Sequence, residues 1–91
     1  MAGPAYTIEI KPAAQRDLKR IKNRSDVRRI ARAIDALANN PRPAGATVLQ
    51  GEGSILRLRV GDYRILYEVD DVSRQVLILR IAHRRDIYHG R

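Results

Sequence analysis

Arginines that share one face of a predicted hairpin are the residues best suited to chemistry in this sequence. Residues 55–60 read I-L-R-L-R-V, and this period-two alternation places Arg57 and Arg59 on one face of a strand. Gly61-Asp62 predicts a turn, and Arg64 follows it on a returning strand close enough to pair with the first. A guanidinium group is a fixed fork of donors that fits phosphate and stays charged at any working pH. Several of them on one sheet surface would stabilise the extra negative charge of a phosphoryl transition state.

Acid–base groups follow near the C-terminal end of the sequence. His83 comes directly after the last predicted strand, Arg84 and Arg85 are next, and Tyr88 lies just beyond. Histidine titrates near neutrality, so His83 is available as an acid or a base. A tyrosine is a poor base unless neighbouring arginines favour its phenolate. A simpler interpretation stays open, in which the arginines are solvated strand residues and His83 is a hydrogen-bonded structural residue.

Residue types exclude several other chemistries. The sequence has no cysteine, which excludes disulfides, thiolate metal sites and cysteine nucleophiles. His83 and His89 are its histidines, and no carboxylate pair stands at ligand spacing beside them, so we expect no metal site. It contains no P-loop and no dinucleotide-binding glycine pattern, so we expect no cofactor. Its serines are typical of caps and turns, which argues against a Ser-His-Asp arrangement.

The charge balance points to a polyanionic or acidic partner. In 91 residues, 18 Lys and Arg stand against 10 Asp and Glu, a net charge of +8. Such a charge attracts phosphate polymers or an acidic protein. Basic residues on the polar side of the first predicted helix would form a footprint for a phosphate backbone if they gather on one face; they include Arg16, Lys19 and Arg20.

Hydrophobic periodicity predicts the elements that must position these residues. Alternation over Tyr6–Ile10 predicts a strand, and Pro12 suits the first turn of a helix that continues to Ile21. A second helix is expected from Ser25, a good N-cap residue, to Ala38. Further strands are expected at residues 47–50, 55–60, 63–69 and 75–82, followed by a tail at 83–91. Continued alternation would place His83 on one face with Leu77, Leu79 and Ile81.

This order predicts one α+β domain spanning residues 1–91. The order is β-α-α-β-β-β-β, with a helical hairpin packed on a mostly antiparallel sheet. The sequence contains no run of about 18 apolar residues. Its N-terminus offers no apolar run of signal-peptide length, so we expect a cytoplasmic protein without a membrane partner.

Three segments carry a family resemblance that covers nearly the whole chain. They are YTIEI with the following KPAAQRDLKRI, then LRLRVGDYRILYEV, and finally LRIAHRRDIY. An L-R-x-G-x-Y-R-I-x-Y-E-V hairpin and a terminal H-R-R-x-x-Y are typical of RelE-like sequences. By these segments the chain resembles the RelE/ParE superfamily of bacterial and archaeal toxins from type II toxin–antitoxin systems, and its RelE branch more closely.

The resemblance implies a ribosome-dependent mRNA endonuclease that cleaves codons in the ribosomal A site. Arg57 lies where the family carries a catalytic basic residue, and Arg64 and Arg84 match its active-site arginines. Tyr88 matches the tyrosine that acts on the 2′-hydroxyl or stacks on the substrate base. Translation would stop because the message is cut while it is being read.

Ile55 departs from the family pattern, because well-known members have a second catalytic lysine there. Either Arg59 or His83 would take over the task of that lysine, and His83 occupies a position that is basic in the family. The residues expected to contact RNA or the ribosome are Arg59 and Arg85, with Arg16, Lys19 and Arg20.

The implied reaction needs no metal ion and no nucleophilic side chain. RNA supplies the nucleophile in its 2′-hydroxyl, so the enzyme needs a base, an acid and positive charge on the phosphate. The resemblance also implies a cognate antitoxin as a partner, beside mRNA and the ribosome. Two alternatives remain: a ParE-like toxin that binds DNA gyrase, a group that generally lacks the HRR…Y cluster, and a non-catalytic basic module that binds the ribosome or RNA.

Overall fold

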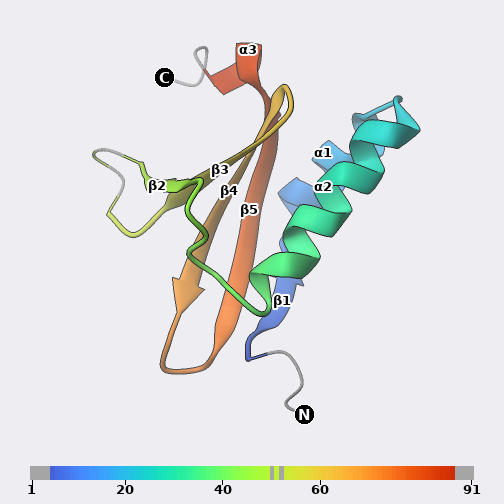
Figure 1. The fold of residues 1–91 in the computed structure, drawn as a ribbon. Helices are drawn as coiled ribbons and strands as arrows, with labels where there is room; N and C mark the ends of the chain where they lie inside the picture. Colours follow the sequence, from blue (N-terminus) through green and yellow to red (C-terminus); the bar gives the residue numbers. More distant parts are fainter. Residues whose placement is uncertain (1–4, 50, 52, 88–91) are drawn as a thin grey trace.

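The alternating segments of the chain form one five-stranded mixed sheet. The computed structural model describes residues 5–49, 51 and 53–87, and its strand order is β1-β5-β4-β3-β2 (Figure 1). β1 pairs with β5 in parallel, and the other pairings are antiparallel. The predicted α+β class and mostly antiparallel sheet are confirmed. The strands are β1 (Thr7–Ile10), β2 (Ala46–Val48), β3 (Leu56–Val60), β4 (Tyr63–Asp70) and β5 (Gln75–His83).

Two helices between β1 and β2 lie against one face of this sheet, and a single helical turn follows β5 (Figure 1). Pro12 is the first residue of the first helix, as predicted, because a missing N–H costs nothing at that position. The expectation of a tail from residue 83 is wrong for residues 84–87, which form this helical turn. The helices are α1 (Pro12–Arg20), α2 (Arg24–Leu37) and α3 (Arg84–Ile87). None of these described helices is long and apolar enough to cross a membrane.

Asn23 caps the second helix. Its side chain accepts a hydrogen bond from the backbone N–H of Asp26 at 3.0 Å, and its own backbone is extended, as an N-cap requires. The prediction of Ser25 as the cap is therefore wrong, because Ser25 already lies inside the first turn of α2.

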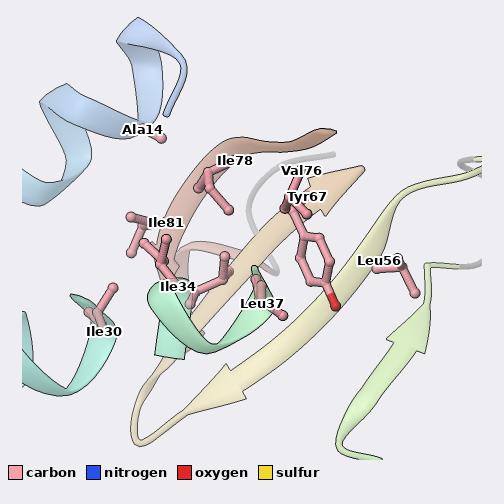
Figure 2. Close-up of a cluster of buried hydrophobic side chains, with 10 residues drawn as sticks. Ala14, Ile30, Ile34, Leu37, Leu56, Tyr67, Val76, Ile78 and Ile81 are labelled. Atoms are coloured by element: carbon pink, nitrogen blue, oxygen red, sulfur yellow. The ribbon is translucent and has the colours of Figure 1, made fainter. Parts of the chain in front are cut away.

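The core lies between the helices and the sheet and is aliphatic except for one tyrosine (Figure 2). Tyr67 is fully buried, and its hydroxyl donates a hydrogen bond to the Pro41 carbonyl at 2.7 Å, which satisfies its polar atom. Burial raises the pKa of Tyr67. Each large aliphatic side chain stabilises the fold by about 1.5–3 kcal/mol on burial. The cluster consists of Ala14, Ile30, Ile34, Leu37, Leu56, Ile65, Tyr67, Val76, Ile78 and Ile81.

A one-residue register shift in β5 decides which of its side chains face the helices. Leu79 has no partner on β4, so the alternation is interrupted there. Ile78 before the shift and Ile81 after it are both buried in the core, and His83 shares the face of Ile81. The expected grouping of His83 with Leu77, Leu79 and Ile81 is therefore correct for Ile81 and wrong for Leu77.

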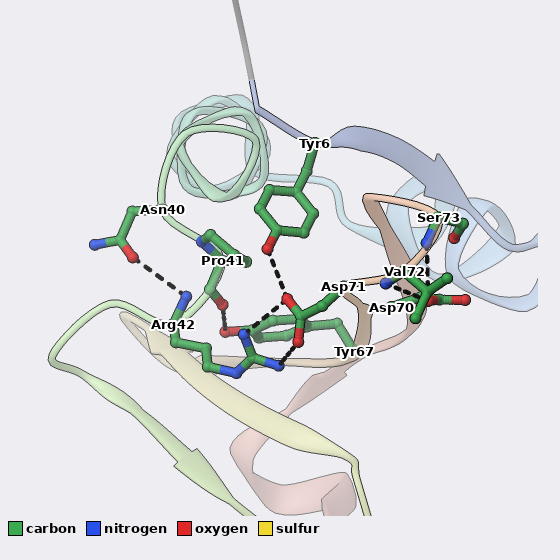
Figure 3. A network of polar contacts seen from close by, with 9 residues as sticks. All are labelled: Tyr6, Asn40, Pro41, Arg42, Tyr67, Asp70, Asp71, Val72 and Ser73. Atoms are coloured by element: carbon green, nitrogen blue, oxygen red, sulfur yellow. Dashed lines mark hydrogen bonds and ion pairs between the residues drawn. The ribbon is translucent and has the colours of Figure 1, made fainter.

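A polar cluster joins three segments at the end of the sheet away from α3 (Figure 3). The Tyr6 hydroxyl donates to the Asp71 carboxylate at 2.6 Å, and the Arg42 guanidinium donates to the same carboxylate at 2.9 and 3.2 Å. The hydrogen bonds from Arg42 and Tyr6 lower the pKa of Asp71. This cluster connects the start of β1, the loop after α2 and the β4–β5 turn.

Candidate functional site

The sheet face away from the helices carries Arg57, Arg59 and Arg64, which we call the arginine face. Arg59 of β3 pairs directly with Arg64 of β4, and Arg57 lies two residues before Arg59, so the three side chains leave the same face. Like charges placed opposite each other destabilise a sheet. Among the described residues, no carboxylate forms an ion pair with any of the three. Such a cluster is typical of a surface that binds an anion.

Local backbone groups hold two of these guanidinium groups. Arg59 Nε donates to the Gly61 carbonyl at 3.2 Å, and Arg64 Nη1 donates to the Tyr63 carbonyl at 3.4 Å. Arg57 and Arg64 are half-buried, whereas Arg59 is exposed. Partial burial and local hydrogen bonds restrict the side chains, so part of the positive charge is oriented before a ligand binds.

The β3–β4 turn connects the arginine face to α3. Gly61 in this turn has a φ of +60°, a conformation that glycine adopts without strain. The backbone N–H of Arg84 donates to the Asp62 carbonyl at 2.7 Å, which places the start of α3 against the turn (Figure 1). A Cβ on Gly61 would lie 3.2 Å from Arg29 Nη2, so α2 also contacts this turn. The exposed Arg84 therefore lies at the same end of the sheet as Arg59 and Arg64.

His83 lies on the opposite face from these arginines. It pairs with Tyr63, and the two rings meet edge to face with centroids 5.2 Å apart and planes at 84°. Tyr63 and Arg64 are consecutive on β4, so their side chains leave opposite faces. His83 Nδ1 accepts a hydrogen bond from the Arg85 backbone N–H at 3.3 Å. This contact orients the His83 ring, and Nε2 is its other hydrogen-bonding atom.

A cleft of about 440 Å³ opens beside His83, between the end of α1 and β5. Asp17 in its wall is 8% exposed and accepts hydrogen bonds from Arg80 at 2.8 and 3.1 Å and from the Ile81 N–H at 2.8 Å. Burial acts to raise the pKa of Asp17, but the hydrogen bonds from Arg80 and Ile81 outweigh it, and the pKa is lowered. The cleft is lined by Asp17, Arg20, Ile21, Tyr63, Arg80, Ile81, Ala82 and His83.

Sequence reasoning missed both Asp17 and Arg80. They stand 63 positions apart, so their ion pair leaves no local pattern in the sequence. The only available signal was an acidic residue near the apolar stripe of an otherwise basic helix.

The remaining predicted site residues fall into three groups. Arg16, Lys19 and Arg20 are exposed on α1, and among them Arg20 lines the cleft. Arg85 is exposed at the start of α3. Tyr88 lies outside the described residues. Within the part of the chain that the structure describes, no three His, Cys, Asp or Glu residues come together as metal ligands.

Comparison with known proteins shows the family of this chain. The family model described as "ParE toxin of type II toxin-antitoxin system, parDE" matches residues 8–88, so the chain belongs to this family of toxins, within the RelE/ParE superfamily. The resemblance read from the sequence is confirmed.

Several relatives belong to the RelE branch. Toxin RelG of Mycobacterium tuberculosis is 34% identical over 83 residues, which cover 91% of this chain and 95% of that protein. The toxin–antitoxin complex RelBE2 of the same organism contains a chain with a TM-score of 0.77 at 30% identity, covering 89% of this chain and 99% of that one. The archaeal RelE–RelB complex of Pyrococcus horikoshii gives a TM-score of 0.76 at 27% identity, covering 88% and 96%.

Proposed function

We propose that this toxin is an mRNA endonuclease that acts in the ribosomal A site and inhibits translation. The arginine face carries this proposal, because it presents Arg57, Arg59 and Arg64 together, and the described residues offer them no carboxylate partner. The similarity to toxins named RelG and RelE supports it. The cytoplasm, where ribosomes are found, is its proposed location.

The proposed chemistry uses the 2′-hydroxyl of the RNA as nucleophile. The 2′-oxygen attacks the adjacent phosphorus, the bond to the 5′-oxygen of the next nucleotide breaks, and the products are a 2′,3′-cyclic phosphate and a 5′-hydroxyl. Arg57 and Arg64 bind the phosphate, and Arg84 stabilises the leaving oxygen. Tyr88 accepts the proton of the 2′-hydroxyl, and a solvent water gives a proton to the leaving 5′-oxygen, which becomes the 5′-hydroxyl. No metal ion or cofactor takes part at the reacting phosphate.

Ile55 stands where the resembling family has a catalytic lysine, and Arg59 and His83 are the two candidates for the role of that lysine. Arg59 lies opposite Arg64 on the arginine face, whereas His83 pairs with Tyr63 on the other face. This geometry supports Arg59 for that task and argues against His83 as the base. Where a single sheet separates two groups, they do not act on the same oxygen.

The proposed partners are mRNA, the ribosome and a cognate antitoxin. The RelBE2 and archaeal RelE–RelB structures are toxin–antitoxin complexes, which supports an antitoxin here. The net charge of +8 favours an acidic antitoxin segment that folds as it binds. Ribosomal RNA would contact Arg16, Lys19 and Arg85, which are exposed.

The decisive experiment is cleavage on programmed ribosomes with an mRNA that has a single 2′-deoxy substitution at the scissile nucleotide. We expect cutting of the all-ribose message and none of the substituted one, with a 5′-hydroxyl on the downstream fragment. Cutting that survives the substitution would overturn the mechanism, because the nucleophile would be missing. Removal of Mg²⁺ cannot replace this experiment, since ribosomes themselves depend on that ion.

The ParE name of the family model favours gyrase binding as the second candidate function. Induction of the toxin separates the two. We expect protein synthesis to stop before DNA synthesis, with mRNA cut inside translated frames. Replication arrest first, with intact mRNA, would indicate a ParE-like toxin that binds DNA gyrase. Ribosome binding without cleavage would indicate a non-catalytic module.

A further inference from the structure

We propose that the cleft between α1 and β5 binds one nucleotide of the mRNA, next to the nucleotide whose phosphate is cut. The base would stack on the Tyr63–His83 pair, and its phosphate would contact Arg20 and Arg80. The inference rests on the proposed mRNA cleavage and adds a second substrate subsite at the edge of β5, where Tyr63 and His83 from the helix-covered face line the cleft together with Arg80.

The size and lining of the cleft suit a nucleotide. Its volume of about 440 Å³ lies within the range of roughly 300–1,000 Å³ that is common for small-ligand sites. Tyr63 and His83 supply an aromatic wall, and stacking on such a wall accepts any base because every base has a π face. The contact of Nδ1 with the Arg85 N–H leaves Nε2 as the ring atom of His83 that could hydrogen-bond to a nucleotide.

The charges in the cleft favour a phosphate over a cation. Asp17 is its acidic lining residue, and the hydrogen bonds from Arg80 and the Ile81 N–H compensate its charge. Arg80 is held through Nε and Nη2 yet remains 54% exposed, so its guanidinium is fixed in orientation and still accessible. Arg20 is exposed at the other wall. Because Arg20 and Arg80 together outweigh Asp17, the net charge of the cleft is positive.

The topology connects the cleft to the arginine face by a short path. β1 pairs with β5 only as far as Ile78, so residues 79–83 form the edge of the sheet beside α1. Arg64 pairs with Ala82, and Ala82 lines the cleft. One strand spacing, about 5 Å, therefore separates the backbone of Arg64 from this edge. A single RNA strand on the arginine face can pass over the edge beside Arg80 and enter the cleft.

Variants on programmed ribosomes test this subsite by separating KM from kcat. Tyr63→Leu removes the aromatic wall and should raise KM about tenfold with little change in kcat, since one stacked base corresponds to about a factor of ten or more in affinity. Tyr63→Phe keeps the ring and should behave like the unaltered toxin. Arg20→Ala should raise KM roughly fivefold, by loss of one phosphate contact.

Arg32→Ala is the matched control, because Arg32 is also an exposed helix arginine but lies outside the cleft. It should leave KM unchanged. Thermal unfolding of every variant shows whether the fold is retained, and Arg20→Ala, at an exposed position, keeps the test available should Tyr63→Leu fail to fold. Unchanged KM in both Arg20→Ala and Tyr63→Leu would overturn the subsite.

A photocrosslink identifies the nucleotide. An mRNA with 4-thiouridine beside a 2′-deoxy scissile nucleotide should crosslink to the peptides that contain Tyr63 or His83, and Arg20→Ala should weaken the crosslink. Cleavage by a toxin that shows no such crosslink would overturn the subsite and leave the proposed function standing. Absence of cleavage by the unaltered toxin would overturn both.

Discussion

Individual arginines of this toxin differ in whether a carboxylate neutralises them. Arg80 is paired with Asp17, and Arg42 with Asp71. Each of these pairs joins segments far apart in the chain, which is a structural role. Arg59 and Arg64 face each other instead, and no ion pair between a described carboxylate and either of them is present. Stability alone would not place two cations opposite each other, so we expect this pair to bind an anion.

Removal of Arg64 or Arg84 should slow cleavage strongly without destabilising the fold. Arg64→Ala and Arg84→Ala are each expected to lower the rate of mRNA cleavage by about a hundredfold or more, the usual loss when one group that stabilises a transition-state charge is removed. Their free energies of unfolding should stay within about 0.5 kcal/mol of the unaltered toxin, because neither guanidinium packs in the core. Single-turnover cleavage and urea unfolding measure the two effects.

Arg32→Ala supplies the control for this pair of variants. It removes the same charge from an exposed position on α2 and should change neither quantity by more than about twofold in rate or 0.5 kcal/mol in stability. Loss of folding in Arg64→Ala or Arg84→Ala would assign these residues a structural role instead.

At the scale of the elements, the predictable part of the site is the part set by local sequence. Period-two alternation and the Gly61-Asp62 turn predicted that the strand of Arg57 and Arg59 pairs with the strand of Arg64, and the structure confirms this pairing, with Arg59 opposite Arg64. The place of His83 depends on the unpaired Leu79 and on which face the helices cover, and neither is encoded within a few residues of His83. The contact of Asp17 with Arg80 exists only once α1 has packed beside β5. Tertiary packing, which the local sequence pattern does not show, therefore determines the face of His83 and the contact of Asp17 with Arg80.

The β3–β4 turn should be sensitive to a side chain at Gly61. Gly61→Ala imposes a φ near +60° on an alanine and should destabilise the fold by about 1–2 kcal/mol. The new Cβ would also displace Arg29 and disturb the turn that holds Arg84 through Asp62, so cleavage should fall several-fold. Urea unfolding and the cleavage rate are the measurements.

Gly53→Ala separates strain from contact. Gly53 has a similar φ of +63°, but nothing lies within 4 Å of an added Cβ. This variant should lose similar stability and keep its cleavage rate. Equal loss of cleavage in both variants would show that the Gly61 turn does not position α3.

The hydrogen bonds of Asp17 at the edge of β5 should stabilise the fold by an amount that falls at acidic pH. The pKa of Asp17 is lower in the folded protein than its ordinary value of 3.8, so its hydrogen bonds stabilise the fold fully above that value. The contribution is lost as the pH falls through the folded pKa. Asp17→Asn should cost about 2 kcal/mol at pH 7, the usual scale for hydrogen bonds to a charged group, and the difference from the unaltered toxin should shrink below pH 3.8.

Urea unfolding from pH 7 to pH 2.5 measures this difference. Asp35→Asn is its control, because Asp35 is exposed on α2 and should change stability little at any pH in this range. A constant difference between Asp17→Asn and the unaltered toxin over the whole range would contradict the argument, since it would not follow the ionisation of Asp17.

At the scale of the whole molecule, the helices cover one face of the sheet, and the other face is the arginine face (Figure 1). The excess of 18 basic over 10 acidic residues is spread over both sides, because α1 and α2 also carry exposed arginines. Long-range attraction would therefore reach an acidic partner from any direction, and we expect contact with the arginine face to determine how long the partner stays bound.

Antitoxin binding should therefore show a charge effect on association and a contact effect on dissociation. The association rate should fall at least about tenfold between roughly 50 mM and 500 mM NaCl, as screening shortens the reach of the charges.

Two double variants have the same net charge, Arg57→Gln with Arg59→Gln on the arginine face and Arg28→Gln with Arg32→Gln on α2. Both should slow association to a similar extent in stopped-flow measurements, since each removes two positive charges. Only the first should speed dissociation, because we expect an acidic antitoxin segment to cover the arginine face, to which the proposed function assigns phosphate binding. Equal dissociation rates for the two would show that inhibition works without covering the arginine face.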